Sequence, residues 1–254
     1  MSKTLKILPV KKESDPELEW VNPILPSVSK CFFLNIVAPP RAGKTNLICN
    51  LLANKDFYYG APGDNPSAWD EIYYFSPSSR FDKTCSKILS SMDNVIRIDD
   101  LDELENSAVI LQEIMNSQRD WDVQKEGRSR PRILVVFDDC LGILHRTGVA
   151  NLSAKYRHYG LSVVVISQSY RKIPLTCRNC MTGLIFFNLV NGKETSKVFD
   201  EVGSGVPDFY QHIKVLDRKY QFVYFNVENQ EMYHNFERLL WSKDQYLDDW
   251  TFIF

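Results

Sequence analysis

The stretch Ala38-Pro39-Pro40-Arg41-Ala42-Gly43-Lys44-Thr45 decides the fold that we expect. It follows the apolar run 32–37 and leads into a second apolar segment at 47–52. This order predicts a β-strand, a tight loop and a helix, and the loop has the phosphate-binding P-loop pattern [A/G]-x-x-x-x-G-K-[S/T]. Backbone N–H groups of the loop, together with the positive end of the helix, would form a concave site for a triphosphate.

The residue types of this loop each have a chemical reason. Lys44 is predicted to reach the β- and γ-phosphates, and the Thr45 hydroxyl to hold Mg²⁺. Gly43 would let the backbone approach the phosphates without an intruding Cβ. Ala38 stands where the strictest pattern has glycine, which costs about 1–2 kcal/mol if that position needs a left-handed backbone. The predicted nucleotide-binding residues are Ala38, Pro39, Pro40, Arg41, Ala42, Gly43, Lys44, Thr45 and Asn46.

A chance G-K-T at a helix start is the alternative to this interpretation. The position of the triplet, after an apolar strand and before an apolar helix, is the context that a P-loop requires, and it favours the functional interpretation.

Length and composition favour a globular α/β protein. The chain has 254 residues and a mass of 29.5 kDa, with 44% hydrophobic and 24% charged residues, as is usual for a folded protein. We expect an extended proline-rich arm at 1–30, an ATPase core at 31–204 and a C-terminal extension at 205–254 packed on the core. The arm could dock on a neighbouring subunit or be a poorly ordered terminus, and both options stay open.

Charge and cysteine content exclude some classes of protein. The net charge is −2 and the pI is near 6.1, so any contact with DNA must come from local basic patches. The six scattered cysteines indicate a reducing compartment, and Cys177-x-x-Cys180 has no second ligand pair at a spacing typical of zinc. We find neither a signal-like apolar segment nor a membrane span, so we expect a soluble protein that is not secreted by the usual route.

A second motif is the apolar run Ile133-Leu134-Val135-Val136-Phe137, which ends in Asp138-Asp139. A buried parallel strand whose carboxyl end delivers carboxylates would look like this, and the pattern resembles a Walker B motif. Asp138 is predicted to bind Mg²⁺, and Asp139 to orient and deprotonate the attacking water. The alternative is a strand that happens to end in a polar turn.

A third motif, the apolar run 161–167, ends in Gln168. A glutamine there can hydrogen-bond both a lytic water and a γ-phosphate oxygen, as a sensor residue would. Further strands are expected at 71–77, 94–98 and 183–189, helices at 99–121, 151–159 and 194–202, and a hairpin from 221–227 and 232–234. Asp99 or Asp100 is the expected N-cap, and Gly160 the expected C-cap.

Two candidate strands separate Lys44 from Asp138 in the sequence, which is typical of P-loop ATPases that have an additional strand between the two motifs. With this layout, the chain resembles the poxvirus-type genome-packaging ATPases of large DNA viruses, within the FtsK/HerA superfamily. The resemblance covers about 30–190, with Asp139 where many members have Glu. It rests on A-P-P-R-A-G-K-T (38–45), I-L-V-V-F-D-D (133–139), Y-R-H-Y-G-L-S-V-V-V-I-S-Q-S-Y (156–170) and I-P-L-T-C-R-N (173–179).

The resemblance implies a RecA-like P-loop NTPase fold of the additional-strand type, with a mainly parallel sheet flanked by helices and a C-terminal edge hairpin. It implies ATP and Mg²⁺ as ligands, and a homo-oligomeric ring, pentameric or hexameric, with nucleotides between subunits. Arg157 matches the position of an arginine that acts on the neighbouring subunit's nucleotide; Arg171 and Arg178 are rivals, and a helix-terminal structural role is the alternative for Arg157.

The resemblance further implies double-stranded DNA and viral capsid or portal proteins as partners. It places the protein in the host cytoplasm at the site of virus assembly, or in association with the virion. Backbone contacts to DNA could come from Arg128, Arg130 and Arg132, or from Arg80 and Lys83, although solvated surface charge explains each of them as well.

Two functional hypotheses follow. The first is an ATP-driven ring motor that moves viral DNA into a preformed capsid. The second is a P-loop protein whose nucleotide state switches partner binding, with little hydrolysis and no movement of DNA. A monomeric helicase or a nucleotide kinase is disfavoured, because the sequence has neither a second motor domain nor an evident acceptor-binding lid.

Overall fold

The apolar runs of the sequence form the middle strands of one sheet. A computed structural model describes residues 21–60, 66–127, 129–140, 142, 148–214, 216 and 220–244. In this part of the chain the sheet has the order β3-β2-β4-β5-β1-β6-β7-β8-β9. Its strands are β1 (Phe33–Val37), β2 (Glu71–Phe75), β3 (Val95–Ile98), β4 (Ile133–Asp138), β5 (Leu161–Ser167), β6 (Gly183–Phe187), β7 (Phe222–Asn226), β8 (Glu231–His234) and β9 (Arg238–Ser242).

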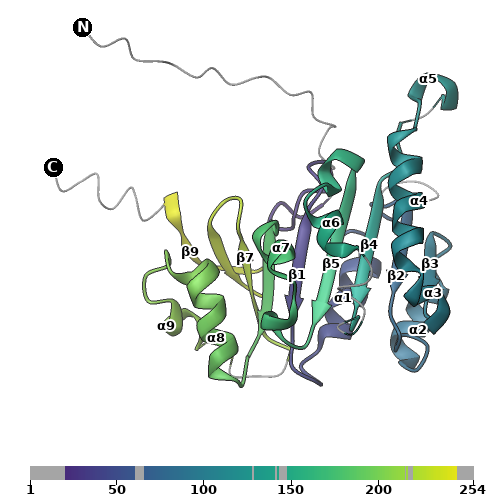
Figure 1. Cartoon of the computed structure of the whole chain (residues 1–254). Helices are drawn as coiled ribbons and strands as arrows, with labels where there is room; N and C mark the ends of the chain where they lie inside the picture. Colours follow the sequence, from purple (N-terminus) through teal and green to yellow (C-terminus); the bar gives the residue numbers. More distant parts are fainter. Residues whose placement is uncertain are drawn as a thin grey trace, which may run out of the picture.

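Helices connect the parallel strands and lie on both faces of the sheet (Figure 1). The α-helices are α1 (Lys44–Ala53), α2 (Lys83–Ser90), α3 (Leu101–Glu105), α4 (Ser107–Arg119), α5 (Val123–Glu126), α6 (Val149–Ser153), α7 (Leu175–Asn179), α8 (Gly192–Val198) and α9 (Phe209–Ile213). Two 3₁₀ turns, η1 (Tyr156–Tyr159) and η2 (Tyr170–Lys172), flank β5, and a π-helical turn, η3 (Phe199–Gly203), continues α8.

The core has two halves because side chains alternate across each strand. In β5, Val163 and Val165 face the cluster that includes residues of α4, α6 and α7, whereas Val164 and Ile166 face the cluster under α1 and α2. Every residue of β1, β4, β5 and β6 is buried. Strands covered on both faces need near-continuous apolar sequence, which is why these runs were recognisable.

The topology brings the motif-bearing strands together. Strands β1 to β6 pair in parallel, and β5 lies between β1 and β4. The additional strand expected between the P-loop strand and the Asp138 strand is therefore confirmed, and it is the strand that ends before Gln168. The carboxyl ends of these strands share one edge of the sheet, at the bottom of Figure 1. We call it the carboxyl edge, and the opposite one the amino edge.

The prediction of one continuous helix at 99–121 is wrong, because the segment forms two helices. It divides at Asn106 into α3 and α4. At this break the Asn106 N–H donates to the Asp102 and Leu104 carbonyls as the C-cap of α3, and the Ser107 hydroxyl donates a hydrogen bond of 2.6 Å to the Leu104 carbonyl. Asp100 is the N-cap and accepts from the Asp102 N–H at 2.9 Å, whereas Asp99 pairs with Arg97.

The helix expected at 151–159 is also divided, into α6 and the 3₁₀ turn η1. Its predicted end is confirmed, because Gly160 has the left-handed backbone of a helix C-cap, with φ 64.

Both ends of the described chain pack on the core. Leu25 and Val28 are buried beside α1 and Trp69, so the last part of the predicted arm contacts its own chain; residues 1–20 lie outside the described residues. The expected hairpin is confirmed as β7–β8, paired antiparallel to β6, and β9 extends it. The domain division at residue 204 stays a prediction. None of the helices in the described part has the length and apolar character of a membrane span.

Candidate nucleotide-binding site

The P-loop leaves β1 and leads directly into α1. The Ala38 N–H donates to the Ser167 carbonyl at 3.0 Å, and Ala38 is fully buried. The loop residues with left-handed backbone are Arg41 (φ 62) and Gly43 (φ 116), so Ala38 carries no such strain and the departure from the strict pattern is tolerated. Gly43 is required by its φ, and also because a Cβ there would lie 2.4 Å from the ring of Tyr220.

Helix α1 begins at Lys44, with its amino end at the carboxyl edge. Its buried face, which includes Leu47, Ile48, Leu51 and Leu52, packs on the sheet. Because this packing fixes the helix axis, the free N–H groups of its first turn are held beside the ends of β4 and β5. This is the geometry of an anion site at a helix N-terminus.

Four of the predicted catalytic residues meet at this edge. The Lys44 ammonium contacts the Asp139 carboxylate and lies 4.0 Å from Asp138 Oδ1. Gln168 Nε2 donates to both Asp139 oxygens, at 3.1 and 3.0 Å. The convergence of these side chains follows from the strand order β4-β5-β1, while their catalytic roles stay predictions.

Asp139 is turned out of the line of β4. Its φ of 57 is left-handed, a conformation that costs a non-glycine residue about 1–2 kcal/mol. Its N–H still donates to the Ile166 carbonyl of β5 at 3.2 Å. The two adjacent acids therefore face different surroundings, Asp138 the interior and Asp139 the partly exposed space beside Lys44 and Gln168.

Asp138 is a buried carboxylate with one oxygen satisfied. Oδ2 accepts a hydrogen bond of 2.9 Å from the Tyr74 hydroxyl, while Oδ1 is buried and, within the described residues, accepts no hydrogen bond. Burial raises the pKa of Asp138, and the charge of Lys44 and the Tyr74 hydrogen bond oppose that rise in part.

These residues fit a magnesium ion. A buried carboxylate oxygen that accepts no hydrogen bond within the described residues, close to the start of α1 where Thr45 carries its hydroxyl, is the kind of hard oxygen ligand that Mg²⁺ prefers. Asp138 and Thr45 would hold the ion, which would supply charge neutralisation for the phosphates.

Tyr74 is a residue of this site that the sequence did not reveal. It lies on β2, is fully buried, and connects Asp138 to Cys85 of α2, whose thiol lies 3.8 Å from the Tyr74 oxygen. Burial and the Asp138 charge raise the pKa of Tyr74, so its hydroxyl remains a donor. The alternation in β2 indicates that Tyr74 is buried, but nothing local identifies its partner 64 residues away.

Arg157 does not lie in this cluster. It belongs to η1, before the start of β5, and hence at the amino edge. Its guanidinium donates to Glu228 at 2.6 Å and to the Tyr156 hydroxyl at 2.9 Å. The side chain is half exposed, and it can therefore be presented to another molecule but not to the Lys44 site of its own chain.

The two rival arginines differ in their surroundings. Arg178 is held by Glu201, donates to the Ile173 carbonyl at 3.1 Å and lies over the Tyr170 ring. Its side chain is only 10% exposed, so reaching a neighbouring subunit would break a buried ion pair, which is costly. Arg171 is exposed near the carboxyl edge and remains a rival to Arg157.

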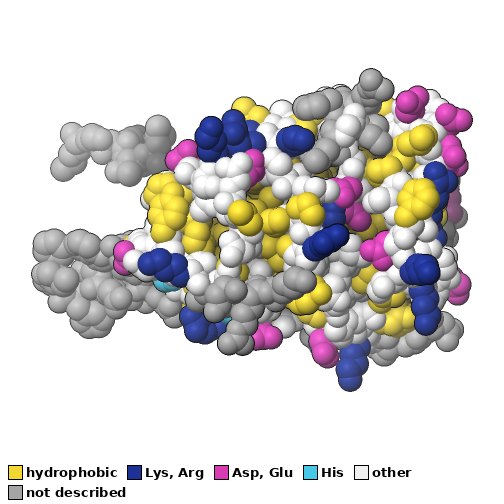
Figure 2. Space-filling view, turned by 90° about the horizontal axis from the view of Figure 1, so that it is seen from below, with side chains coloured by type: hydrophobic (Ala, Val, Ile, Leu, Met, Phe, Trp, Pro, Cys, Tyr) yellow, Lys and Arg dark blue, Asp and Glu magenta, His cyan; other side chains and the backbone are white. Residues whose placement is uncertain are grey.

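The candidate DNA contacts are distributed over both edges. Arg132 pairs with Asp70, and Arg130 packs against Gly160 at the amino edge; Arg128 lies outside the described residues. Arg80 lies over the ring of Phe81, and Lys83 begins α2. Figure 2 looks onto the carboxyl edge, where basic and acidic side chains are interspersed with hydrophobic ones.

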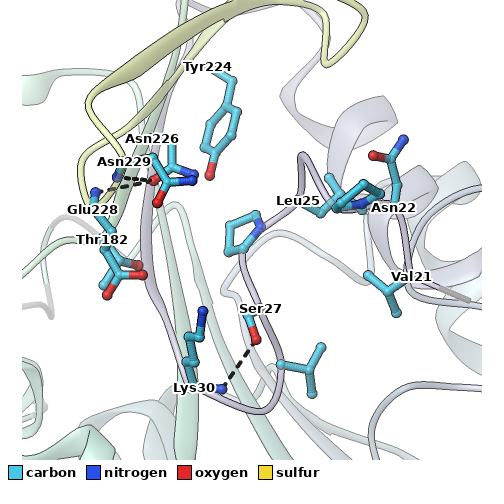
Figure 3. Close-up of a pocket in the computed structure, with 13 residues that line it drawn as sticks. Val21, Asn22, Leu25, Ser27, Lys30, Thr182, Tyr224, Asn226, Glu228 and Asn229 are labelled. Carbon is cyan, nitrogen blue, oxygen red and sulfur yellow. Dashed lines mark hydrogen bonds between the residues drawn. The ribbon is translucent and has the colours of Figure 1, made fainter. Parts of the chain in front are cut away.

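A separate pocket opens at the amino edge (Figure 3). It is lined by the segment 21–30, by Thr182, and by the β7–β8 turn. In that turn the Glu228 and Asn229 N–H groups both donate to Asn226 Oδ1, at 3.1 Å. The pocket lies at the opposite edge of the sheet from Lys44. The Asn226 side chain in its wall holds the turn that carries Glu228, the residue to which Arg157 donates.

Comparison with known proteins shows which family and which folds the chain resembles. Residues 92–199 match the family model described as Poxvirus A32 protein, and this segment carries Asp138, Asp139, Arg157 and Gln168. The resemblance to poxvirus-type ATPases is thereby confirmed. A comparison with the curated proteins gives no significant match.

Solved structures confirm the predicted fold class, an α/β fold with a mainly parallel sheet flanked by helices that is shared with P-loop ATPases. The genome packaging NTPase B204 from Sulfolobus turreted icosahedral virus 2, in complex with ATP-gammaS, matches with a TM-score of 0.52 and 14% identity, over 80% of this chain and 96% of that one. The pCW3 conjugation coupling protein TcpA gives 0.52 and 15%, over 77% and 57%. EssC (ATPases 2 and 3) from Geobacillus thermodenitrificans gives 0.52 and 14%, over 77% and 37%.

We expect Tyr74→Phe to weaken Mg²⁺-dependent nucleotide binding about tenfold, because a group that orients a metal ligand typically contributes about 10–100-fold to metal affinity. Tyr73→Phe is the matched control, since its hydroxyl bonds to Glu71 at 3.0 Å on the same strand. Titration of an ATP analogue with and without Mg²⁺ measures the effect. Equal affinities of the two variants would contradict a role for Tyr74.

We expect Asp138→Asn to abolish Mg²⁺-dependent binding of nucleotide while stabilising the nucleotide-free fold at neutral pH. The raised pKa of Asp138 means that folding favours its protonated form. The stability that this form contributes is present below the unfolded-state pKa and is lost as the pH rises through the folded-state pKa. The melting-temperature advantage of Asp138→Asn over wild type should therefore grow with pH over the range above the ordinary carboxyl pKa of about 4. A constant difference across that range would refute the explanation.

Proposed function

We propose that this chain is the ATP-hydrolysing subunit of a ring motor that moves double-stranded viral DNA into a preformed capsid. The observation that carries the proposal is the meeting of Lys44, Asp138, Asp139 and Gln168 at the carboxyl edge, beside the P-loop. The match to the Poxvirus A32 family model and the fold shared with a genome packaging NTPase support the choice of cargo.

The residues at this edge divide the work of ATP hydrolysis. Lys44 and the first turn of α1 would bind the β- and γ-phosphates, and Asp138 with Thr45 would hold Mg²⁺. Lys44 contacts Asp139 in the structure; when phosphate takes over the lysine, the Asp139 carboxylate becomes available to orient and deprotonate water. Gln168, bonded to both Asp139 oxygens, fixes the direction of that carboxylate.

Exposed hydrophobic residues support assembly into a ring. Several large apolar side chains stand in the connections at the carboxyl edge, namely Phe81 (74% exposed), Leu101 (62%), Leu175 (57%), Val190 (90%) and Tyr220 (57%). Such residues favour contact with another protein surface. A neighbouring copy seated there would cover the nucleotide and could present Arg157 from its amino edge, with its guanidinium oriented by Glu228 and Tyr156.

The proposed ring would contact DNA and capsid or portal proteins. Backbone contacts of lysine and arginine in the ring would grip DNA without reading its sequence. Capsid or portal proteins would anchor the ring, in the host cytoplasm where virions assemble.

We expect Lys44→Ala to lose nucleotide binding, and Asp139→Asn to keep binding while hydrolysis falls by about 100-fold or more, as for loss of a general base. ATP turnover with and without double-stranded DNA, together with the size of the ATP-analogue complex, is the measurement. An Asp139→Asn variant with undiminished hydrolysis would refute the assignment. Negligible turnover by wild type, with or without DNA, would favour the alternative of a nucleotide-dependent switch.

We expect Arg157→Ala subunits to bind ATP normally and to inhibit wild-type rings in mixtures. Because the arginine would act on the neighbour's nucleotide, activity should fall more steeply than the fraction of variant, and a ring of variant alone should lose about 1,000-fold or more. Arg119→Ala, which removes an exposed arginine paired with Asp120, is the control. A linear loss with mixing fraction would argue against action between subunits.

A further inference from the structure

The turn that follows β5 is held by an acidic residue of α8. The Ser169 hydroxyl donates to Glu194 Oε1 at 2.9 Å, and the Arg171 N–H donates to Glu194 Oε2 at 3.2 Å. Both oxygens of one half-buried carboxylate thus bind two positions of the same turn. Glu194 lies in the first turn of α8, and no motif of the sequence had drawn attention to it.

Further hydrogen bonds hold the turn in place, some within the turn and one to η3. The buried Ser167 hydroxyl donates to the Ser169 carbonyl at 2.7 Å and accepts from the Ser169 N–H at 3.0 Å. The Tyr170 hydroxyl donates to Glu201 of η3 at 2.8 Å. Burial alone would raise the pKa of Glu201. Hydrogen bonds from Tyr170 and Lys197 and the charge of Arg178 have the larger effect and lower that pKa, so the Glu201 carboxylate is ionised at neutral pH.

Gln168 depends on this turn for its orientation. Its side chain is exposed, so packing does not fix its rotamer as it would in the core. The backbone on both sides of Gln168 is fixed instead. The strand β5 holds the residues before Gln168, and the hydrogen bond between Ser169 and Glu194 holds the residue after it. A shift of that backbone would move the amide away from Asp139, and displacements of about 1 Å in a catalytic site can cost about 100-fold in rate.

We propose that Glu194 is a positioning residue for Gln168. By holding Ser169 and Arg171 it sets where the Gln168 amide meets Asp139, and it ties α8 to the hydrolytic centre. The inference rests on the proposed function in so far as Gln168 and Asp139 act in hydrolysis. The competing explanation is structural, because an acid in the first turn of a helix also stabilises that helix by itself.

The experiment compares the ATP hydrolysis of Glu194→Ala, Glu194→Gln and Ser169→Ala. For Glu194→Ala we expect kcat about tenfold lower, with the affinity for an ATP analogue and the melting temperature close to wild type. Glu194→Gln should be intermediate, because its carbonyl can accept from Ser169 while its amide cannot accept from the Arg171 N–H. Glu113→Gln, an exposed acid of α4, is the control and should behave as wild type.

A double-mutant cycle tests whether Glu194 acts on Gln168 through Ser169. If Glu194 acts through Ser169, the double variant Ser169→Ala/Glu194→Ala should be no slower than Glu194→Ala alone, since interacting residues are not additive. Additive losses would overturn the proposal. So would a Glu194→Ala variant whose kcat equals that of Glu113→Gln, or one whose loss is explained by a lower melting temperature.

A second readout separates this inference from the proposed function. The side-chain amide signal of Gln168, assigned as the one missing from Gln168→Glu, reports the bond to Asp139 by nuclear magnetic resonance without any turnover. If wild type hydrolyses no ATP, the motor proposal fails, and Glu194 is still tested by whether Glu194→Ala shifts that signal. An unmoved signal overturns the positioning role whether or not the chain is a motor.

Discussion

The site depends on one electrostatic arrangement, the Lys44 ammonium held beside two carboxylates at the ends of parallel strands. A carboxylate as buried as Asp138 is costly, as its raised pKa indicates. The free energy gained by packing the surrounding sheet, in which β1, β4 and β5 are buried along their whole length, offsets the free energy lost by burying this charge. The apolar strands provide the rigidity that keeps an unfavourable charge where the proposed metal ion and triphosphate would bind.

The sequence predicted the elements whose signals are local. Strands covered on both faces have to be apolar throughout, so β1, β4, β5 and β6 were found within one or two residues. The residues at the carboxyl ends of β1, β4 and β5 were recognised as site candidates. Parallel pairing then brought Lys44, Asp139 and Gln168 together without further information, because the carboxyl ends of adjacent parallel strands share one edge.

The rest depends on partners that are distant in the chain. Tyr74 supports Asp138, and Glu194 holds the turn after Gln168, yet neither residue belongs to a motif, and their partners are fixed only by the register of the sheet and the position of α8. The break between α3 and α4 falls at Asn106, the C-cap of one helix and the residue before the other, and helical periodicity does not show where a helix is interrupted. The strand β9 has the sequence RLLWS with only Ser242 buried, so it shows no alternation of apolar and polar residues that would predict a strand.

The two edges of the sheet carry different parts of the proposed mechanism. The groups that we propose to bind phosphate and to hydrolyse ATP are at the carboxyl edge, and Arg157 is at the amino edge beside Glu228. Because the sheet separates them, one chain cannot supply both to one nucleotide. Arg178, the rival nearer to the site, is committed to Glu201 of its own chain. Of the three candidate arginines, Arg157 of a second copy and the exposed Arg171 therefore remain. Only Arg157 of these two has its guanidinium oriented in advance by an acid and a tyrosine of its own chain.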